Sequence, residues 1–275
     1  MSSILTNTSA MTALQTLKGI NKNLAMIQDQ VSTGKKVNTA KDNAGIWAVA
    51  SIMEADVKGF KAISESLSLG QATTAVARNA TETVKDLLVE MKALIVTSQG
   101  ENVDRAKIQA DITQLSEQIN QVVQSAQFNG KNLLLTASTD MEVLASLDRD
   151  GVGGVTTSNI TVGAQDIEAI YTAVVAYDVS DTAGAQAALA DIETQIQAAI
   201  DGAAAFGSAE KRLEIQSNFV GKLMDSMNSG IGALVDADME AASARLQSLS
   251  VQQQLGLQSL SIANANPQNL LSLFR

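Results

Sequence analysis

The 275-residue sequence contains no cysteine and no histidine. Their absence excludes Ser-His-Asp and Cys-His catalysis, thiolate zinc sites and disulfide bonds, and it leaves carboxylate chemistry as the remaining catalytic class. A complete lack of cysteine fits a protein that works outside the reducing cytosol. The first thirty residues nevertheless lack the continuous apolar stretch and cleavage site of a secretory signal, so export is expected to follow an unusual route.

Proline and aromatic residues are also scarce. Proline occurs once, at Pro267, and aromatic residues make up 3% of the chain. Long helices are therefore permitted, and a core of Ala, Leu, Ile, Val and Met suits slender helix bundles. The hydrophobic content of 45% is enough for an ordered core. No continuous apolar run of roughly eighteen residues occurs, so no membrane-spanning segment is predicted.

Basic clusters are absent from a chain with a formal net charge of −10. This balance argues against binding nucleic acid, because phosphate backbones are held mainly by clustered Lys and Arg. The nearest approach to a cluster, Lys35, Lys36 and Lys41, is interpreted as a solvated loop. No metal or cofactor is expected.

Both ends of the chain are uncharged and have helical periodicity. No ionisable side chain occurs in residues 1–17 or 246–274. At the N-terminal end, apolar residues recur in steps of three and four, which is typical of a coiled-coil seam. These residues are Ala10, Ala13, Leu17, Ile20, Leu24, Ile27 and Val31.

The C-terminal end repeats nearly the same rhythm. Its predicted seam consists of Ala242, Leu246, Leu249, Gln253, Leu257 and Leu260, and Val251, Leu255 and Ile262 make a second stripe. Helices with more than one apolar face predict a subunit that completes its core by packing against copies of itself.

Between the ends, turn signals divide the chain into further helices. Gly34 is placed to end the first helix, and Asn38 or Thr39 is a candidate N-cap for the next. A long helix is predicted from about residue 45 to 98, with a length of about 80 Å if it is continuous. After a turn at 100–102, a helix with the clearest periodicity of the chain runs to about Gln127, and a turn follows at 128–130.

The segment from about 133 to 184 is rich in Thr, Val, Gly and Ser and is interpreted as a small β excursion. Strands are predicted at 141–147 and 159–162, around the sequence DGVGG at 150–154, which is interpreted as a loop and not as a phosphate site. Helical spacing resumes from 185. The expected fold class is mainly α, a long-helix bundle and a terminal coiled coil with a small β insert.

Three acids lie close together at Asp236, Asp238 and Glu240. They could bind a hard cation, but the glycine turn and distant bidentate Glu of an EF-hand are missing. A helix start is the preferred interpretation, because acids in the first turn interact well with the helix dipole.

Four segments carry a specific resemblance to a known family. They are STGKKVNTAKDNAGIWAVA at 32–50, IQADITQLSEQINQVVQSAQFNGKNLL at 108–134, VDADMEAASARL at 235–246 and ANANPQNLLSLFR at 263–275. In these segments and in their order, the chain resembles bacterial flagellins. The resemblance implies a structural, non-enzymatic subunit that polymerises into the flagellar filament for motility, with terminal helices that fold on assembly.

The resemblance also implies a domain organisation. Residues 1–40 with 236–275 would form the terminal coiled-coil domain of the inner tube. Residues 41–135 with 185–235 would form a helical second layer, and 136–184 a small β-rich insert of that layer. Because no large outer domain is available, a minimal subunit and a thin, smooth filament are expected.

Location and partners follow from the same resemblance. Members of the family are exported unfolded by a type III apparatus into the extracellular filament, without a cleaved signal. The implied partners are other flagellin subunits in a homopolymer or mixed filament, the flagellar cap, hook-associated junction proteins and an export chaperone on the C-terminal segment. No nucleic acid and no membrane insertion are implied.

Two sets of site residues are assigned. Polymerisation is assigned to Leu17, Ile20, Leu24, Ile27 and Val31 in the N-terminal seam and to Leu246, Leu249, Leu257 and Leu260 in the C-terminal seam. In receptor-activating relatives, an Arg, Leu and Gln patch on the long helix is read by the host Toll-like receptor for flagellin. The matching positions here are Glu90, Leu94 and Thr97, an altered patch with a charge reversal that disfavours this recognition.

Three alternatives remain open. A hook-filament junction protein shares the terminal helices and would be present in far fewer copies. An enzyme using carboxylates such as Asp150 in the β insert would reveal itself by bound metal or hydrolytic activity. A secreted coiled-coil effector would not explain the ending of the chain.

Overall fold

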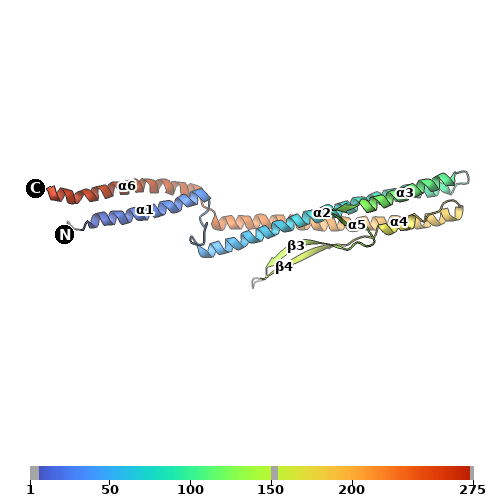
Figure 1. The fold of residues 1–275 in the computed structure, drawn as a ribbon, viewed down its shortest axis with the longest axis horizontal. Helices are drawn as coiled ribbons and strands as arrows, with labels where there is room; N and C mark the ends of the chain where they lie inside the picture. The colour runs from blue at the N-terminus through green and yellow to red at the C-terminus, as the bar shows by residue number, and fades with distance from the viewer. Residues whose placement is uncertain (1–5, 150–153, 273–275) are drawn as a thin grey trace. The chain divides into compact units, whose positions relative to one another are not determined.

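The computed structural model describes residues 6–149 and 154–272 and is dominated by helices, as predicted (Figure 1). The elements in chain order are α1 (Thr8–Thr33), α2 (Ala44–Ser98), α3 (Arg105–Ser125), β1 (Gln127–Phe128), β2 (Lys131–Asn132), β3 (Met141–Arg149), β4 (Val155–Val162), α4 (Glu168–Val174), α5 (Thr182–Val235) and α6 (Met239–Ser272).

The chain divides into two compact units. Met1–Ala55 and Ser226–Arg275 form the first, here called the terminal unit, and Asp56–Asp225 forms the second, the bundle unit. Helices α2 and α5 contribute residues to both.

The bundle unit has a core made mainly of aliphatic side chains. Helices α2 and α5 run antiparallel in it, as shown by ion pairs from Arg78 to Glu210 at 2.8 Å and from Lys92 to Glu193. The fully buried side chains include Ile63, Leu67, Leu88, Met91, Ile95, Ile112, Ile119, Ile192 and Phe206. One aromatic ring among many aliphatic side chains agrees with the composition, which favoured a slender bundle.

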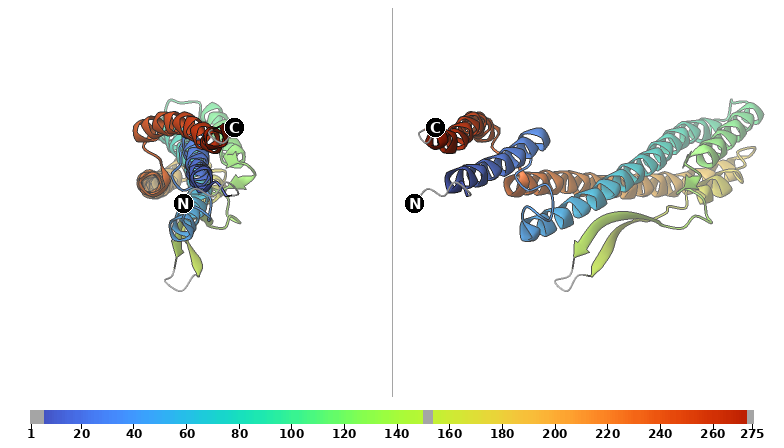
Figure 2. Two further views of the ribbon diagram at one scale, coloured as in Figure 1. Left: turned by 90° about the vertical axis from the view of Figure 1, so that its left-hand side faces the viewer. Right: turned by 60° about the vertical axis from the view of Figure 1, so that its left-hand side comes forward.

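Helix α2 is continuous over 55 residues, which confirms the predicted long helix. Gly59 and Gly70 do not interrupt it. Instead they allow the β3–β4 hairpin to approach, because a Cβ at Gly70 would lie 2.6 Å from Val143 Cγ2 and one at Gly59 would lie 3.2 Å from Leu147 Cδ2. Within the bundle unit the hairpin extends beside α2 (Figures 1 and 2).

Strands β3 and β4 pair antiparallel and extend beyond the predicted ranges. A bulge between Leu144 and Ser146 leaves the carbonyl of Ala145 outside the ladder, and Gln216 Nε2 on α5 donates to it at 2.8 Å. The hairpin is therefore attached to both long helices. Most of the predicted DGVGG loop, including Asp150, lies outside the described residues.

The β excursion ends earlier than predicted, because α4 occupies part of the segment expected to be irregular or β. Asp166 Oδ1 accepts from the Ala169 N–H at 3.0 Å in its first turn. Glu168 also accepts from the Thr136 N–H at 3.0 Å. A helix of seven residues is too short to show clear periodicity, so tertiary contacts and not sequence pattern determine it.

The predicted turn at 128–130 is confirmed as the loop of the β1–β2 hairpin. Asn129 and Gly130 have φ angles of 51° and 81°, the left-handed pair that two-residue hairpin turns require.

The break after α1 also lies where Gly34 predicted it, with φ 69° and its N–H bonded to Gln30 O. The predicted cap for α2 was wrong, however. Asn43 Oδ1 accepts from the Ile46 N–H at 3.1 Å, whereas the N–H groups of Asn38 and Thr39 donate to Asp42. The carboxylate of Asp42 thus holds the loop, and the cap lies directly before the helix. Over the part of the chain that the structure describes, no helix is long and apolar enough to span a bilayer.

Candidate assembly surface of the terminal helices

Helices α1 and α6 lie side by side and antiparallel in the terminal unit (Figures 1 and 2). Asn7 Nδ2 donates to Ala263 O at 2.8 Å, and Gln253 Nε2 donates to Asn21 Oδ1 at 2.8 Å. These two bonds join opposite ends of the sequence. The predicted terminal coiled coil is therefore present within a single chain.

The predicted N-terminal seam occupies the less exposed face of α1. Ile27 is buried, and the other six positions are half-buried. A face that remains half-exposed contributes less hydrophobic stabilisation than a closed core, because the effect scales with the area removed from water.

The C-terminal seam differs from the prediction at one position. Its less exposed residues follow alternating steps of four and three: Ala242, Leu246, Leu249, Gln253, Gly256, Leu260 and Ala263. Leu257 was wrongly placed in this seam, since its side chain is 53% exposed. The step of three from Gln253 leads to Gly256 and turns Leu257 onto the outer face.

Gly256 fits this position because α1 passes close to it. A Cβ there would lie 3.1 Å from Leu17 Cδ1 and 3.8 Å from Ile20 Cδ1. The small residue lets two larger seam side chains approach the backbone of α6. Sequence reasoning missed it because a step of four from Gln253 to Leu257 was preferred, although strict alternation of four and three would have found Gly256.

The outer faces of both terminal helices carry large apolar side chains. They include Met11, Leu14 and Met26 on α1 and Val251, Leu255, Leu257 and Ile262 on α6. Met11 and Ile262 are 67% and 66% exposed. Both belong to the uncharged end segments. Large exposed apolar patches in such surroundings mark interaction sites.

The base of the terminal pair is held by backbone bonds. Lys36 N–H donates to Val235 O at 2.6 Å, Ala237 N–H donates to Gly34 O at 2.9 Å, and Lys35 pairs with Glu54 at 3.3 Å. Lys36 and Lys41 are exposed, as expected of a solvated loop.

Asp42 fixes the loop before α2 electrostatically. Hydrogen bonds from the Thr39 N–H and hydroxyl, followed by the Asn38 N–H, lower the pKa of Asp42. The carboxylate form is therefore favoured, since these donors stabilise negative charge.

The acidic trio marks a helix start, as predicted. Asp238 Oδ1 accepts from the N–H groups of Glu240 and Ala241 at 3.0 and 3.1 Å, which caps α6. Among the residues that the structure describes, no group of three acidic, His or Cys side chains gathers as a metal site would require.

The residues matching the receptor patch lie on one face of α2. Glu90 and Thr97 are exposed, and Leu94 is half-buried. The spacing of four and three residues aligns them along the helix.

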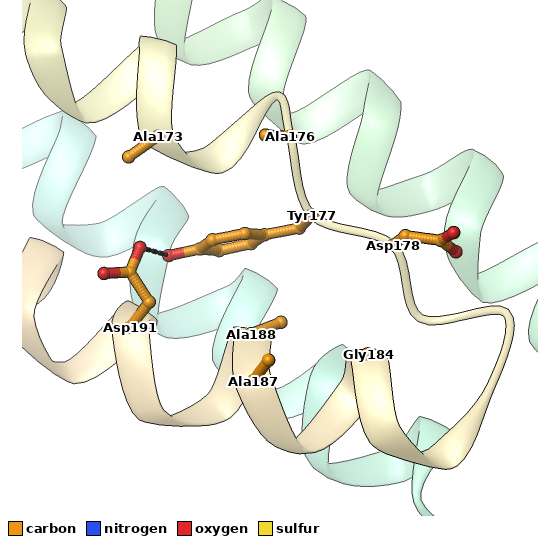
Figure 3. Close-up of a pocket in the computed structure, with 8 residues that line it drawn as sticks. All are labelled: Ala173, Ala176, Tyr177, Asp178, Gly184, Ala187, Ala188 and Asp191. Carbon is orange, nitrogen blue, oxygen red and sulfur yellow. Dashed lines mark hydrogen bonds between the residues drawn. The ribbon is translucent and has the colours of Figure 1, made fainter.

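A shallow hollow of about 360 Å³ lies in the bundle unit between the segment after α4 and the start of α5 (Figure 3). Tyr177 reaches across it and donates to Asp191 Oδ2 at 2.8 Å. Burial, with the hydrogen bond and charge of Asp191, raises the pKa of Tyr177 far above its usual value, so its hydroxyl stays protonated. Alanines, Gly184 and Asp178 line the rest, and the arrangement serves to join two segments.

Comparison with known proteins identifies the family. Residues 4–139 match the model of the bacterial flagellin N-terminal helical region, and residues 189–274 match that of the C-terminal helical region. The chain belongs to the bacterial flagellin family. It is 40% identical to a flagellin of Brucella melitensis over the full length of both chains. It is 38% identical to flagellin FljK of Caulobacter vibrioides, covering all of this chain and 99% of the other.

A putative flagellar hook-associated protein from Vibrio parahaemolyticus has a similar structure, with a TM-score of 0.53 over 71% of this chain and all of that one. At 11% identity this likeness shows the fold alone. Full-length similarity to flagellins favours the filament subunit over the junction protein. This flagellin is therefore a structural subunit of the bacterial flagellar filament.

Proposed function

We propose that the terminal helices of this flagellin drive polymerisation, with seam residues holding α1 against α6 and outer residues contacting neighbouring subunits. The seam set is Leu17, Ile20, Leu24, Ile27 and Val31 with Leu246, Leu249 and Leu260. Leu257 belongs to the outer set, because it faces away from α1. The observation that carries the proposal is the set of large exposed apolar side chains on both helices, most of which lie in the charge-free segments 1–17 and 246–274.

Folding of the ends is coupled to assembly in this proposal. Ordering costs about 1 to 2 kcal/mol of backbone entropy per residue, and a half-buried seam offsets only part of that cost. Neighbouring subunits would cover the outer residues at about 25 cal/mol per Å² of apolar area. The terminal pair is therefore expected to be loose in the monomer and ordered in the filament.

The proposed polymer has the terminal pair, residues 1–40 with 236–275, in an inner tube and the helical segments 41–135 and 185–235 around it. The insert 136–184 adds a hairpin and a short helix rather than a large projecting domain, which supports a thin, smooth filament. Identical contacts that repeat head to tail without closing generate such a helical polymer.

Export and partners complete the proposal. The lack of cysteine supports an extracellular location, and the flagellin relatives support passage through the flagellar export apparatus. Cap and hook-associated junction proteins would meet the same terminal surface at the filament ends. An export chaperone would cover the uncharged C-terminal segment before assembly.

We also propose that the altered receptor patch disfavours recognition by the host receptor for flagellin. Glu90 and Thr97 are exposed on α2, so they are positioned for contact with a partner. Replacing Glu90 with Arg is expected to increase binding to the isolated receptor ectodomain severalfold. A change of Glu82 to Arg on the same helix is the control. Equal binding of both variants would contradict the assignment.

The test of polymerisation uses seeded assembly. Purified monomer is mixed with sheared filament fragments in sulfate, which strengthens apolar burial, and growth is followed by pelleting and negative-stain images. Intact chains should form long filaments, and chains trimmed by protease at both ends should form none.

A matched pair of variants locates the effect. Leu255→Asp places a charge on the outer apolar face of α6 and should raise the critical concentration at least tenfold, because a charge would be buried in the polymer. Gln254→Asp adds the same charge at an exposed polar position of α6. Equal assembly by both variants, or growth of trimmed chains, would refute the proposal.

A further inference from the structure

Helix α2 of the bundle unit carries an exposed apolar strip with acidic borders. Val89 and Val96 are 50% and 51% exposed, and Ala93 between them is also exposed. Steps of four and three residues align the three on one face. We call this strip, together with its exposed acidic neighbours, the acidic ridge. Those neighbours are Glu82, Asp86, Glu90 and, just after α2, Glu101.

Helix α5 carries a strip of the same apolar character with the opposite charge. Ile215 and Phe219 lie one turn apart and are 59% and 57% exposed. Exposed Lys211, Arg212 and Lys222 border them, and Lys211 pairs with Glu214 of its own helix at 2.8 Å. We call this strip the basic ridge. An exposed aromatic side chain is typical of the centre of a protein interface, and charged side chains are typical of its rim.

We infer that the basic ridge of one subunit docks on the acidic ridge of a second copy of this chain. The inference rests on the proposed polymerisation and adds a contact outside the terminal helices. Subunits in a polar filament share one direction, and α2 and α5 run antiparallel within a subunit. The two ridges therefore meet antiparallel.

One alignment of α5 with α2 of the neighbour brings the apolar side chains of the two ridges into contact. Placing Phe219 between Val89 and Ala93 of the neighbour puts Ile215 between Ala93 and Val96, since each step of three or four residues on one helix matches a step on the other. The two most exposed large apolar side chains of α5 are then covered by the apolar side chains of α2.

The same alignment places basic side chains of α5 opposite acidic side chains of α2 at both ends of the apolar contact. Lys222 falls opposite Asp86 and Glu90, and Lys211 falls opposite Glu101 at the end of α2. A basic residue thus meets an acid on each side of the apolar contact. Such complementary charges select the register and suppress alternatives.

Basic side chains on the border of α2 do not cancel the acidic ridge. Lys85 pairs with Asp86 at 2.8 Å, and Lys92 pairs with Glu193 of α5. Arg78 lies between Glu82 and Glu210, at 2.7 and 2.8 Å. These pairs balance Glu82 and Asp86 as well as the cations, so Glu90 and Glu101 carry the remaining negative charge of the ridge.

The ridges of a single subunit cannot meet each other. Contacts of α2 with α5 place residues 78 and 92 level with residues 210 and 193, so the basic ridge lies beside an earlier part of α2. At 1.5 Å per residue, the offset is on the order of 35 Å along the bundle. Docking thus requires a second copy displaced by this distance. The contact joins two different patches of copies that are displaced along one direction, so it repeats without closing, as a filament requires.

Engineered cysteines test this contact directly, because the natural chain has none. Filaments of a chain carrying Phe219→Cys and Ala93→Cys are assembled from seeds under reducing conditions and then oxidised. Since the two positions are far apart within one subunit, disulfides can form only between subunits. Denaturing electrophoresis without reductant should then show a ladder of dimers, trimers and larger species.

The matched control carries Phe219→Cys with Thr83→Cys, which also lies exposed on α2 but about 15 Å from Ala93 along the helix. Its crosslinking should be at least fivefold lower. If the first pair does not polymerise when reduced, Ile215→Cys with Val96→Cys probes the same register.

Filaments that pellet normally but give no ladder above the control would overturn the docking contact and leave the proposed function intact. Failure of the natural chain to grow from seeds would instead count against the proposed function.

Discussion

The two units of this flagellin use the same helical periodicity but close their cores to different degrees. In the bundle unit, Leu88, Ile95 and Ile119 are wholly inaccessible to solvent. In the terminal pair, Ile27 is the one buried residue of the described α1, and Ala242 and Ala263 are the buried ones in residues 239–265 of α6. Apolar spacing therefore predicts which face packs, but not how completely one chain covers it.

From this difference we expect the bundle unit to fold within one subunit and the terminal pair to complete its folding on assembly. The bundle unit excludes water within one subunit and is expected to be stable alone, since fully buried aliphatic side chains each contribute about 1.5 to 3 kcal/mol. The terminal pair leaves large apolar side chains on its outer face. We expect it to reach a comparable stability only in the polymer.

The largest predicted effect is a difference in monomer stability between two leucine truncations, one in each unit. Leu88→Ala should lower the free energy of unfolding of the monomer by about 2 to 5 kcal/mol, because it leaves a cavity in a closed core. Leu24→Ala in the half-buried seam should cost the monomer less than about 1.5 kcal/mol but strongly reduce seeded growth. Urea unfolding of both monomers, beside pelleting assays, measures the contrast. Equal losses of monomer stability would contradict the difference in core closure between the two units.

A second contrast tests how tightly the hairpin packs in the bundle unit. Gly70→Ala places a Cβ 2.6 Å from Val143 Cγ2, and the stiff β-branched side chain cannot move away without the strand. We expect a loss of about 1 to 3 kcal/mol in thermal or urea unfolding. Gly221→Ala on α5 is the control, since its Cβ would meet nothing within 4 Å, and it should stabilise by up to about 1 kcal/mol. Stabilisation by both changes would contradict the close packing of the hairpin.

A third contrast concerns the close approach of the terminal helices. Gly256→Leu would push Leu17 out of the seam, whereas Gly19→Leu on α1 meets open space. In Gly256→Leu, overpacking should destabilise the seam by about 1 to 3 kcal/mol and raise the critical concentration for assembly roughly tenfold. Gly19→Leu should not show this destabilisation of the seam. Seeded growth over a concentration series measures the critical concentration. If Gly256→Leu assembles as well as the natural chain, the helices do not approach as described.

The smallest predicted effect is a pH dependence of the loop before α2. Because its pKa is lowered in the folded loop, Asp42 stabilises that loop above the ordinary pKa of 3.8, and this contribution is lost as the pH falls through the lowered value. Fluorescence of Trp47, which lies five residues away and is partly exposed, should change in this acid range. Asp42→Asn should remove the change. An identical acid transition in the variant would assign it to another group.

Much of this fold could be predicted because helices and turns depend on local chemistry. Gly34 and Asn129–Gly130 end or reverse the chain through left-handed backbone angles, and Asp238 caps α6. The cap at Asn43 was missed because Asn38 and Thr39 are equally suitable by type, and only Asp42 determines that they face the loop.

The remaining features depend on contacts between distant segments. Helix α4 follows from bonds such as that between Glu168 and Thr136, and the roles of Gly70 and Gly256 follow from which side chain passes them. The misplaced Leu257 shows that hydrophobicity alone can mislead by one residue, which on a helix is a rotation of 100°. The exposed outer face of α6 was predicted in part, since Val251, Leu255 and Ile262 form the second apolar stripe expected from their spacing.

The most direct test of this account is amide hydrogen exchange, followed residue by residue in the monomer and in the filament. We predict that residues 8–33 and 239–265 exchange within seconds in the monomer and become protected by at least a hundredfold in the filament. Residues of the bundle core, such as 84–95, should be protected in both. Strong protection of the terminal helices in the isolated monomer would contradict the coupling of their folding to assembly.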